Sequence, residues 1–277
     1  MKKILALILA AVLCAALFCG CTVTKDGDNT DTAGNNGGNN APASDLAYVK
    51  NNGKIIIGVT VFQPMDWQDN GEWVGFDAEM AKKFAEYLDV DAEFMIIADW
   101  SKKAMELDTK GVDVVWNGMT LTDEVKSLMG TSEPYCKNAQ IVVVKKELAD
   151  SIKSVEDLKS LTFAVENGSA GAKALAAINV EYTAVDTQDK ALMEVSTGAS
   201  QACVVDLLMA GAMIGEGTSM PNLTTSISLT EEEYGVGFRK GSDLVAEFNK
   251  FWKAAYQDGT VMQMAEKYGI SQNIIAK

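Results

Sequence analysis

Blocks of apolar residues separated by polar turns predict alternating strands and helices along most of the chain. In the stretch GVDVVWNGMTLTDEV, residues 111–125, a short apolar run behind a glycine turn is typical of a buried strand. A threonine three residues before a carboxylate, as in Thr120 and Asp123, can cap free backbone N–H groups and indicates a helix start. The strand therefore brings Asn117, Gly118 and Thr120 to its C-terminal edge, where open α/β sheets bind small ligands.

Two later segments repeat this order of a buried strand, polar residues and a helix start. They are 163–171 (FAVENGSAG) and 202–206 (ACVVD). The apolar runs of strand type are, in order, 54–59, 93–97, 112–115, 140–144, 162–166, 182–185, 202–205, 223–229 and 234–238. The helical segments are 77–88, with Asp77 as its cap, a short helix ending at 107, 155–159, 169–178, 189–197, a helix from 207, 242–257 and 261–268. This rhythm predicts mainly parallel, doubly wound sheets.

Two such α/β series follow one another, and a last segment returns to the first. The simplest packing is two lobes, the second inserted into the first, with a cleft at the strand C-termini of both. We expect residues 45–138 together with 232–277 to form the first lobe, and residues 139–231 to form the second. Closure of the cleft would be a hinge motion at the crossovers near 138–141 and 230–234.

The first 44 residues do not fit this pattern. In residues 1–20, two lysines precede an apolar stretch that is too short for a spanning helix, which is the layout of an export signal. The sequence FCGC, ending at Cys21, is similar to the lipobox of bacterial lipoproteins, in which the last cysteine is acylated; plain secretion is the alternative. Residues 21–44 are mostly polar and predict a flexible, lipidated tether. We expect a protein anchored at the outer face of the cytoplasmic membrane.

Composition narrows the classes of partner. The formal net charge is −14, which argues against nucleic acid and against electrostatic docking on anionic lipid. The chain has no histidine, and Cys136 and Cys203, the cysteines left after the signal and Cys21, lack metal-ligand spacing. We therefore expect no metal and no cofactor. The two thiols could form a disulfide in an exported protein, but their positions favour unpaired thiols.

A series of short motifs runs in one order through residues 53–269. The motifs are GKIIIGV, PMDW, VGFDAEMAKKFA, ADW, GVDVVWNGMTLT, SEPY, SVEDLKSLTFAVENGSAG, VVD, YGVGFRKGSDL and DGTVMQMAEKYG. In this order they resemble the extracytoplasmic solute-binding proteins of polar amino-acid ABC importers, which have the type II periplasmic-binding fold. The resemblance implies a monomer that binds an amino acid between two lobes and presents it to a membrane ABC permease.

In the first lobe, the resemblance assigns aromatic side chains and a strand end to the ligand. Phe62 would stack on the ligand from the first loop, and Trp100 would close the other side; core packing is the alternative for both. Asn117, Gly118 and Thr120 would hold the α-carboxylate and α-amine of the ligand.

In the second lobe, the turn at Gly168, Ser169 and Ala170 would donate backbone N–H groups to the carboxylate. A helix begins there, so its unpaired N–H groups and positive dipole end suit an anion. Asp206 would take the ammonium group; its alternative role is the N-cap of the following helix.

One position departs from the family. An Arg that clamps the carboxylate is expected where this chain has Val125, followed by Lys126. The helix start at Ser169 could hold the carboxylate alone, Lys126 could swing in, or the ligand could lack a free carboxylate. In the last case Trp116, beside the other aromatics and with Asp206 and Glu166, would suit a cationic or methylated amine.

A second class of function is an enzyme on the same fold, similar to a dehydratase. Catalysis would need a positioned acid or base, and Glu166 is the one candidate in the expected cleft. The absence of histidine and of paired-carboxylate spacing favours a binding protein without catalytic activity.

Overall fold

One mixed sheet of nine strands organises the part of the chain that the computed structural model describes, residues 44–277. The strands are β1 (Lys54–Val59), β2 (Trp67–Asp69), β3 (Glu72–Val74), β4 (Asp91–Ile96), β5 (Val114–Thr120), β6 (Gly130–Thr131), β7 (Cys136–Lys145), β8 (Phe163–Glu166), β9 (Tyr182–Val185), β10 (Ala202–Asp206) and β11 (Leu223–Phe238). Strands β2 and β3 form a separate hairpin; the others follow the order β4-β1-β5-β11-β7-β10-β8-β9, with β6 on β11. The expected signal, the lipidated Cys21 and the tether up to residue 43 lie outside the described residues.

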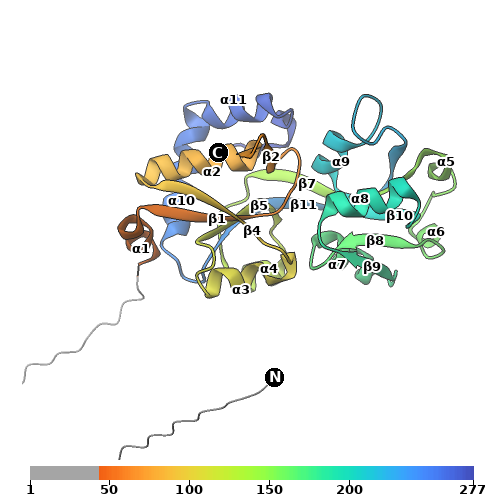
Figure 1. Ribbon diagram of the computed structural model, residues 1–277, viewed down its shortest axis with the longest axis horizontal. Coiled ribbons are helices and arrows are strands. Elements are labelled where there is room, and N and C mark those ends of the chain that lie inside the picture. Colours follow the sequence, from red (N-terminus) through yellow and green to blue (C-terminus); the bar gives the residue numbers. More distant parts are fainter. Residues whose placement is uncertain (1–43) are drawn as a thin grey trace, which may run out of the picture. The chain divides into compact units, whose positions relative to one another are not determined.

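Helices connect and cover these strands (Figure 1). They are α1 (Asp45–Asn52), α2 (Phe76–Leu88), α3 (Lys103–Asp108), α4 (Asp123–Leu128), α5 (Lys146–Ala149), α6 (Val155–Leu158), α7 (Ala170–Ala177), α8 (Gln188–Thr197), α9 (Leu207–Met213), α10 (Leu244–Gln257) and α11 (Thr260–Lys267), with the 3-10 turns η1 (Trp100–Lys102) and η2 (Ser271–Asn273). Within residues 44–277, no helix has both the length and the apolar character needed to span a membrane.

The two ends of the sheet are parallel and its centre is antiparallel. Strand β1 pairs in parallel with β4 and β5, and β8 pairs in parallel with β9 and β10. Between these ends, β7 and β11 run antiparallel to each other from Cys136↔Tyr234 to Lys145↔Leu223. We call the β4-β1-β5 end the first lobe and the β10-β8-β9 end the second lobe. The expected fold class of two mainly parallel α/β lobes is confirmed.

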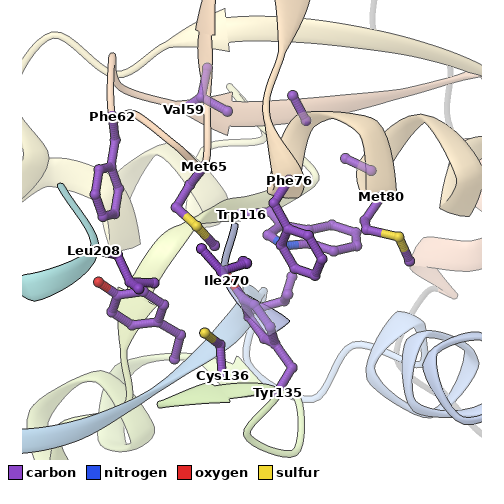
Figure 2. Packing of buried hydrophobic residues seen from close by; sticks show 14 of the residues in the cluster. Val59, Phe62, Met65, Phe76, Met80, Trp116, Tyr135, Cys136, Leu208 and Ile270 are labelled. Carbon is purple, nitrogen blue, oxygen red and sulfur yellow. The ribbon is translucent and has the colours of Figure 1, made fainter. Parts of the chain in front are cut away.

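An aromatic core fills the first lobe. Trp116 on β5 is fully buried, and its ring centroid lies 4.9 Å from that of Phe248 on α10. Phe62, Phe76 and Tyr135 belong to the same apolar cluster, as Figure 2 shows. Each large apolar side chain removed from water contributes about 1.5–3 kcal/mol to folding, so this cluster stabilises the lobe that carries one wall of the site.

Two local expectations need correction. Asp77 does not cap α2; Gly75 occupies the N-cap position, at φ 120°, where an added Cβ would overlap the Met65 carbonyl. The Asp77 carboxyl is buried instead, and it accepts hydrogen bonds from the Tyr135 hydroxyl (2.7 and 2.8 Å) and the Gly118 N–H (2.7 Å). Helix α1 was not expected, and Ser44 caps it by accepting from the Ala47 N–H at 2.9 Å.

The state of the two cysteines agrees with the one that the sequence favoured. Cys136 and Cys203 are both buried and free, which confirms the unpaired thiols. Burial raises the pKa of each thiol above its usual range, so both are inert hydrophobic side chains at neutral pH.

Candidate functional site

A cavity with an empty volume of about 440 Å³ lies between the two lobes. Its first-lobe wall comes from the segments after β1 and β4, from β5 and from α4; its second-lobe wall comes from β8, the start of α7, α8 and the end of β10. The lining residues are Thr60, Trp100, Lys103, Asn117, Gly118, Met119, Thr120, Thr122, Val125, Gln140, Glu166, Gly168, Ser169, Ala170, Lys173, Gln188 and Asp206.

Nine of the eleven residues expected to bind the ligand line this one cavity. They are Trp100, Asn117, Gly118, Thr120, Glu166, Gly168, Ser169, Ala170 and Asp206. They come from strand ends and helix starts in both lobes, which is the placement expected for the C-terminal edges of parallel strands.

Phe62 and Trp116 lie elsewhere, which differs from the expectation. Trp116 precedes Asn117 on β5, and since side chains alternate along a strand, it faces the aromatic core. Phe62 is 2% exposed and packs edge-on against Tyr234, behind Gly118, where an added Cβ would overlap the phenyl ring. Phe62 therefore supports the cavity wall, and of the three expected aromatic residues Trp100 alone lines the cavity.

Asp206 ends β10, and amide groups surround its carboxylate. One oxygen accepts from the Gln140 amide at 2.6 Å and from Asn138, and the other accepts from Gln188. Asp206 holds the N-cap position of α9, but its side chain makes no capping hydrogen bond, so the N-cap alternative is wrong for the side chain. Among residues 44–277 it has no salt-bridge partner. Burial, and then the nearby Glu232 carboxylate, raise the pKa of Asp206 well above its usual range.

Glu166 ends β8 and adds a second carboxyl group to this wall. Its side chain is 3% exposed, and burial together with the charge of Asp206 raises its pKa to about 8. Burial raises the pKa of both carboxyl groups, and the charge of Asp206 raises that of Glu166 further, so a cationic group in the cavity would relieve both the burial cost and the repulsion.

The start of α7 forms an anion-binding edge. Ser169 caps the helix by accepting from the Ala172 N–H at 3.1 Å, and the remaining first-turn N–H groups have no partner within the helix. Gly168 precedes it at φ 71°, and an added Cβ there would lie 2.6 Å from the Ser101 Cα in the first lobe. The two lobes therefore touch at this glycine.

Sequence reasoning missed six polar residues of the cavity, namely Thr60, Lys103, Thr122, Gln140, Lys173 and Gln188. Burial, and then the charge of Lys173, lower the pKa of Lys103 to about 8. Lys103 carried a weak signal, since it lies four residues before Leu107 on the same buried face of α3. Gln140 carried another, because it is a polar residue at the start of an apolar run.

The wall at α4 holds Val125, which lines the cavity and is 4% exposed. Lys126, the neighbour that could have replaced an arginine, is exposed and lines an adjoining groove, which shares Thr120, Thr122, Ala170 and Lys173 with the cavity but is not part of it. In this structure Lys126 therefore does not swing into the cavity.

Sequence comparison identifies the family. Residues 55–271 match the family described as bacterial extracellular solute-binding proteins, family 3. The chain belongs to this family. Among named members, this solute-binding protein is similar to the L-cystine-binding protein TcyJ of Escherichia coli (strain K12), at 31% identity over 229 residues covering 80% of this chain and 85% of that protein. It is also 27% identical over 222 residues to the arginine-binding extracellular protein ArtP of Bacillus subtilis (strain 168), covering 78% and 86%.

Solved structures of similar proteins agree with the fold. A P235GK mutant of ArgBP from T. maritima has a TM-score of 0.76 and 29% identity, covering 81% of this chain and 99% of that one. A substrate-binding protein of an ABC uptake transporter from Streptococcus pneumoniae with bound histidine has a TM-score of 0.75 and 26% identity, covering 82% and 97%. The ancestral amino acid-binding protein AncCDT-1, a precursor of cyclohexadienyl dehydratase, has a TM-score of 0.74 and 30% identity, covering 81% and 99%.

Proposed function

We propose that this solute-binding protein binds a small polar solute, an amino acid, in the cavity between its lobes and delivers it to a membrane ABC permease. The observation that carries the proposal is the Asp206 carboxylate, which lines the cavity, is 3% exposed and has amide donors but no cation beside it. The names of the relatives support the same class of solute, since they include proteins that bind cystine, arginine and histidine.

The ligand would lie between the two lobes with its ends recognised separately. Its ammonium group would bind Asp206, and Glu166 would add a second acceptor. Its carboxylate would lie at the start of α7, near Ser169 and Ala170. The polar end of β5, at Asn117, Gly118 and Thr120, and the Trp100 ring would complete the wall.

The lobes would open and close to load this ligand. We place the first lobe at residues 45–138 together with 232–277, the second at 139–231, and the hinges at the crossovers near 138–141 and 230–234. In support, the register of β11 against β7 shifts between residues 225 and 230. Such irregular strand segments absorb backbone rotation more readily than regular ones do.

The same proposal covers how the protein is held at the cell surface. A signal over residues 1–20, a lipid on Cys21 and the polar segment after it would tether a monomer at the outer face of the cytoplasmic membrane. The family description of extracellular solute-binding proteins supports export. Incorporation of a labelled fatty acid that is lost in a Cys21→Ser variant would test the anchor.

Two alternatives have an observation in their favour. The cavity carries two carboxyl groups near Trp100, which would suit a cationic amine without a carboxylate. An enzyme of the dehydratase type is the other, since Glu166, with a pKa of about 8, holds a proton at neutral pH. We favour a binding protein without catalytic activity, and loss of substrate from equilibrium binding samples would overturn that choice.

Titration calorimetry with the common L-amino acids tests the proposed function. At least one should bind, and Asp206→Ala should weaken its affinity by about 10–150-fold, because a hydrogen bond to a charged group contributes about 1.5–3 kcal/mol. Asp150→Ala, whose side chain is exposed in the second lobe, is the matched control and should bind as the parent does. Equal affinity in parent and Asp206→Ala would contradict the ammonium site.

A further inference from the structure

Lys103 is the one lysine within residues 44–277 that is buried, at 8% exposure. Lysine side chains normally reach solvent, because an ammonium group loses much of its solvation free energy in an apolar environment. Lys103 opens α3 and instead extends its side chain along the cavity wall. The burial of the Lys103 ammonium group at the cavity wall therefore needs a physical explanation.

The other buried cation of the described chain shows what a structural role requires. Arg239 is 9% exposed and forms ion pairs with Asp45 at 2.9 Å and with Asp113 at 3.0 Å. Lys103 has no ion pair among residues 44–277. Its Nζ donates to the Trp100 carbonyl at 3.2 Å and to the Gly168 carbonyl at 3.4 Å, and lies 4.9 Å from the centroid of the Trp100 ring.

An ammonium group has three N–H donors, and these two long hydrogen bonds to neutral carbonyls leave one of them free. Both carbonyls are weaker partners for a buried charge than a carboxylate would be. The unsatisfied positive charge lies at a cavity wall, so an anionic group in the cavity is the partner that would satisfy it.

Lys103 and the start of α7 converge on the same place. The Gly168 carbonyl that accepts from Nζ belongs to the residue before Ser169, the N-cap of the eight-residue helix α7. An anion at the free N–H groups of α7 would therefore lie beside the Lys103 ammonium. A helix N-terminus and a buried cation act together on a carboxylate, the first through aligned N–H groups and the second through charge.

The charges of Glu166, Glu124 and Asp99 act on Lys103 through space, but among residues 44–277 none of these carboxylates lies within ion-pair distance of its Nζ. Lys173 lines the cavity, but it is half-exposed and already forms an ion pair with Glu124. Val125 offers an apolar surface, and Lys126 lies outside the cavity. Asp206 and Glu166 lie on the second-lobe wall, where the ammonium group of a ligand would favour their ionised forms.

We infer that Lys103 binds the carboxylate of the ligand, and that the solute is an amino acid with a free α-carboxylate. The inference rests on the proposed function and deepens it, because it decides against an amine that lacks a carboxylate. Lys103 belongs to the first lobe and α7 to the second. A carboxylate that binds both the Lys103 ammonium and the free N–H groups of α7 would therefore also stabilise the closed arrangement of the lobes.

The test compares each L-amino acid that binds the parent protein with its α-carboxamide. The parent should bind the acid at least about tenfold more tightly than the amide. Lys103→Met, which keeps the length and apolar stem of the side chain, should lower affinity for the acid about 10–100-fold and leave affinity for the amide within about twofold. Lys103→Arg should restore the preference for the acid.

Lys102→Met is the matched control, because Lys102 is the adjacent lysine and its side chain is 57% exposed. Circular dichroism and the thermal midpoint should show that all three variants fold. Equal losses for acid and amide in Lys103→Met, or no loss for either, would overturn the inference. A parent protein that binds amides as tightly as acids would overturn it as well. If the parent binds no amino acid at all, the proposed function itself fails, and that outcome is seen before any variant is made.

Discussion

Among residues 44–277, the buried carboxyl groups without an ion-pair partner form two pairs, one at the cavity and one in the core of the first lobe. Glu166 and Asp206 form the cavity pair, and Asp66 and Asp77 form the core pair. All four side chains are nearly inaccessible to solvent. Burial raises the pKa of each above its usual range, to about 8 for Glu166 and to about 7 for Asp77.

The pairs differ in what surrounds them. The cavity pair faces empty space, and Asp206 accepts hydrogen bonds from three amide side chains. The core pair faces packed side chains. Asp77 accepts hydrogen bonds from the Tyr135 hydroxyl and the Gly118 N–H, whereas the oxygens of Asp66 have no hydrogen-bond partner among residues 44–277. A raised pKa therefore does not mark a binding site by itself; open space and converging donors distinguish the cavity pair.

We therefore assign a role in folding stability to the core pair and a role in ligand binding to the cavity pair. Asp77 still affects the site indirectly, because its hydrogen bond fixes the backbone at Gly118, which lines the cavity. Substitutions in the two pairs should therefore separate stability from affinity.

The largest expected effect is on stability, from Asp77→Ala. The substitution leaves the Tyr135 hydroxyl and the Gly118 N–H buried without their acceptor, at about 1–3 kcal/mol each. We expect the free energy of unfolding in urea to fall by about 2–5 kcal/mol. Asp150→Ala, at an exposed position, should change it by less than about 0.5 kcal/mol. If Asp77→Ala and the parent were equally stable, the core pair would have no role in folding stability that distinguishes it from the cavity pair.

The next effect concerns affinity and the closed arrangement of the lobes. A Cβ at residue 168 would overlap the backbone of Ser101 in the other lobe, so Gly168→Ala should hinder closure and lower affinity for the ligand about 10–100-fold. The measurement is calorimetric titration with the amino acid that binds the parent.

Gly241→Ala is the control for backbone strain alone. Gly241 also has a positive φ, 79°, but an added Cβ there would contact nothing within 4 Å. This control should lose about 1–2 kcal/mol of stability and keep its affinity. Similar affinities for the two variants would show that the cavity forms without this contact.

The smallest effect is a pH dependence from Asp66. Burial, and then the charge of Asp77, raise the pKa of Asp66, so the folded state keeps a proton that the unfolded state releases above about pH 4. Stability therefore falls as pH rises towards the raised pKa of the folded state. Asp66→Asn cannot release this proton, so its stability relative to the parent should rise by about 1–2 kcal/mol between about pH 5 and pH 7.

Urea unfolding of both proteins at the two pH values measures this difference. A parallel pH dependence in the parent and Asp66→Asn would show that Asp66 titrates normally in the folded protein. By the same linkage the cavity pair should also lower stability as pH rises, and in addition it should make ligand binding depend on pH.

Local sequence signals predicted much of the fold. Strands β1 and β9 occupy the residues expected from their apolar runs, and α7 begins at the expected turn, capped by Ser169. The N-cap of α4 is Thr122 rather than Thr120, to which the pattern pointed. Strand β5 runs on to Thr120, past the apolar run 112–115 that predicted it, because its last residues pair with β11. Such pairing joins segments more than a hundred residues apart, and a local pattern does not contain it.

The missed features of the site also depend on distant contacts. Lys103 is buried where the turn at Gly168 covers it, 65 residues away. Gln140 and Gln188 carry no motif, and only the folded chain brings their amides to Asp206. Trp116 and Phe62 had the right residue type, but the register of β5 and the packing behind Gly118 direct them into the core.

A crystal structure with the bound amino acid would show directly which groups of the cavity hold the ligand. We expect the ligand's ammonium nitrogen to lie about 3 Å from a carboxylate oxygen of Asp206, with its carboxylate at the start of α7. A ligand bound outside the cavity, or one whose ammonium group points away from Asp206, would contradict this expectation.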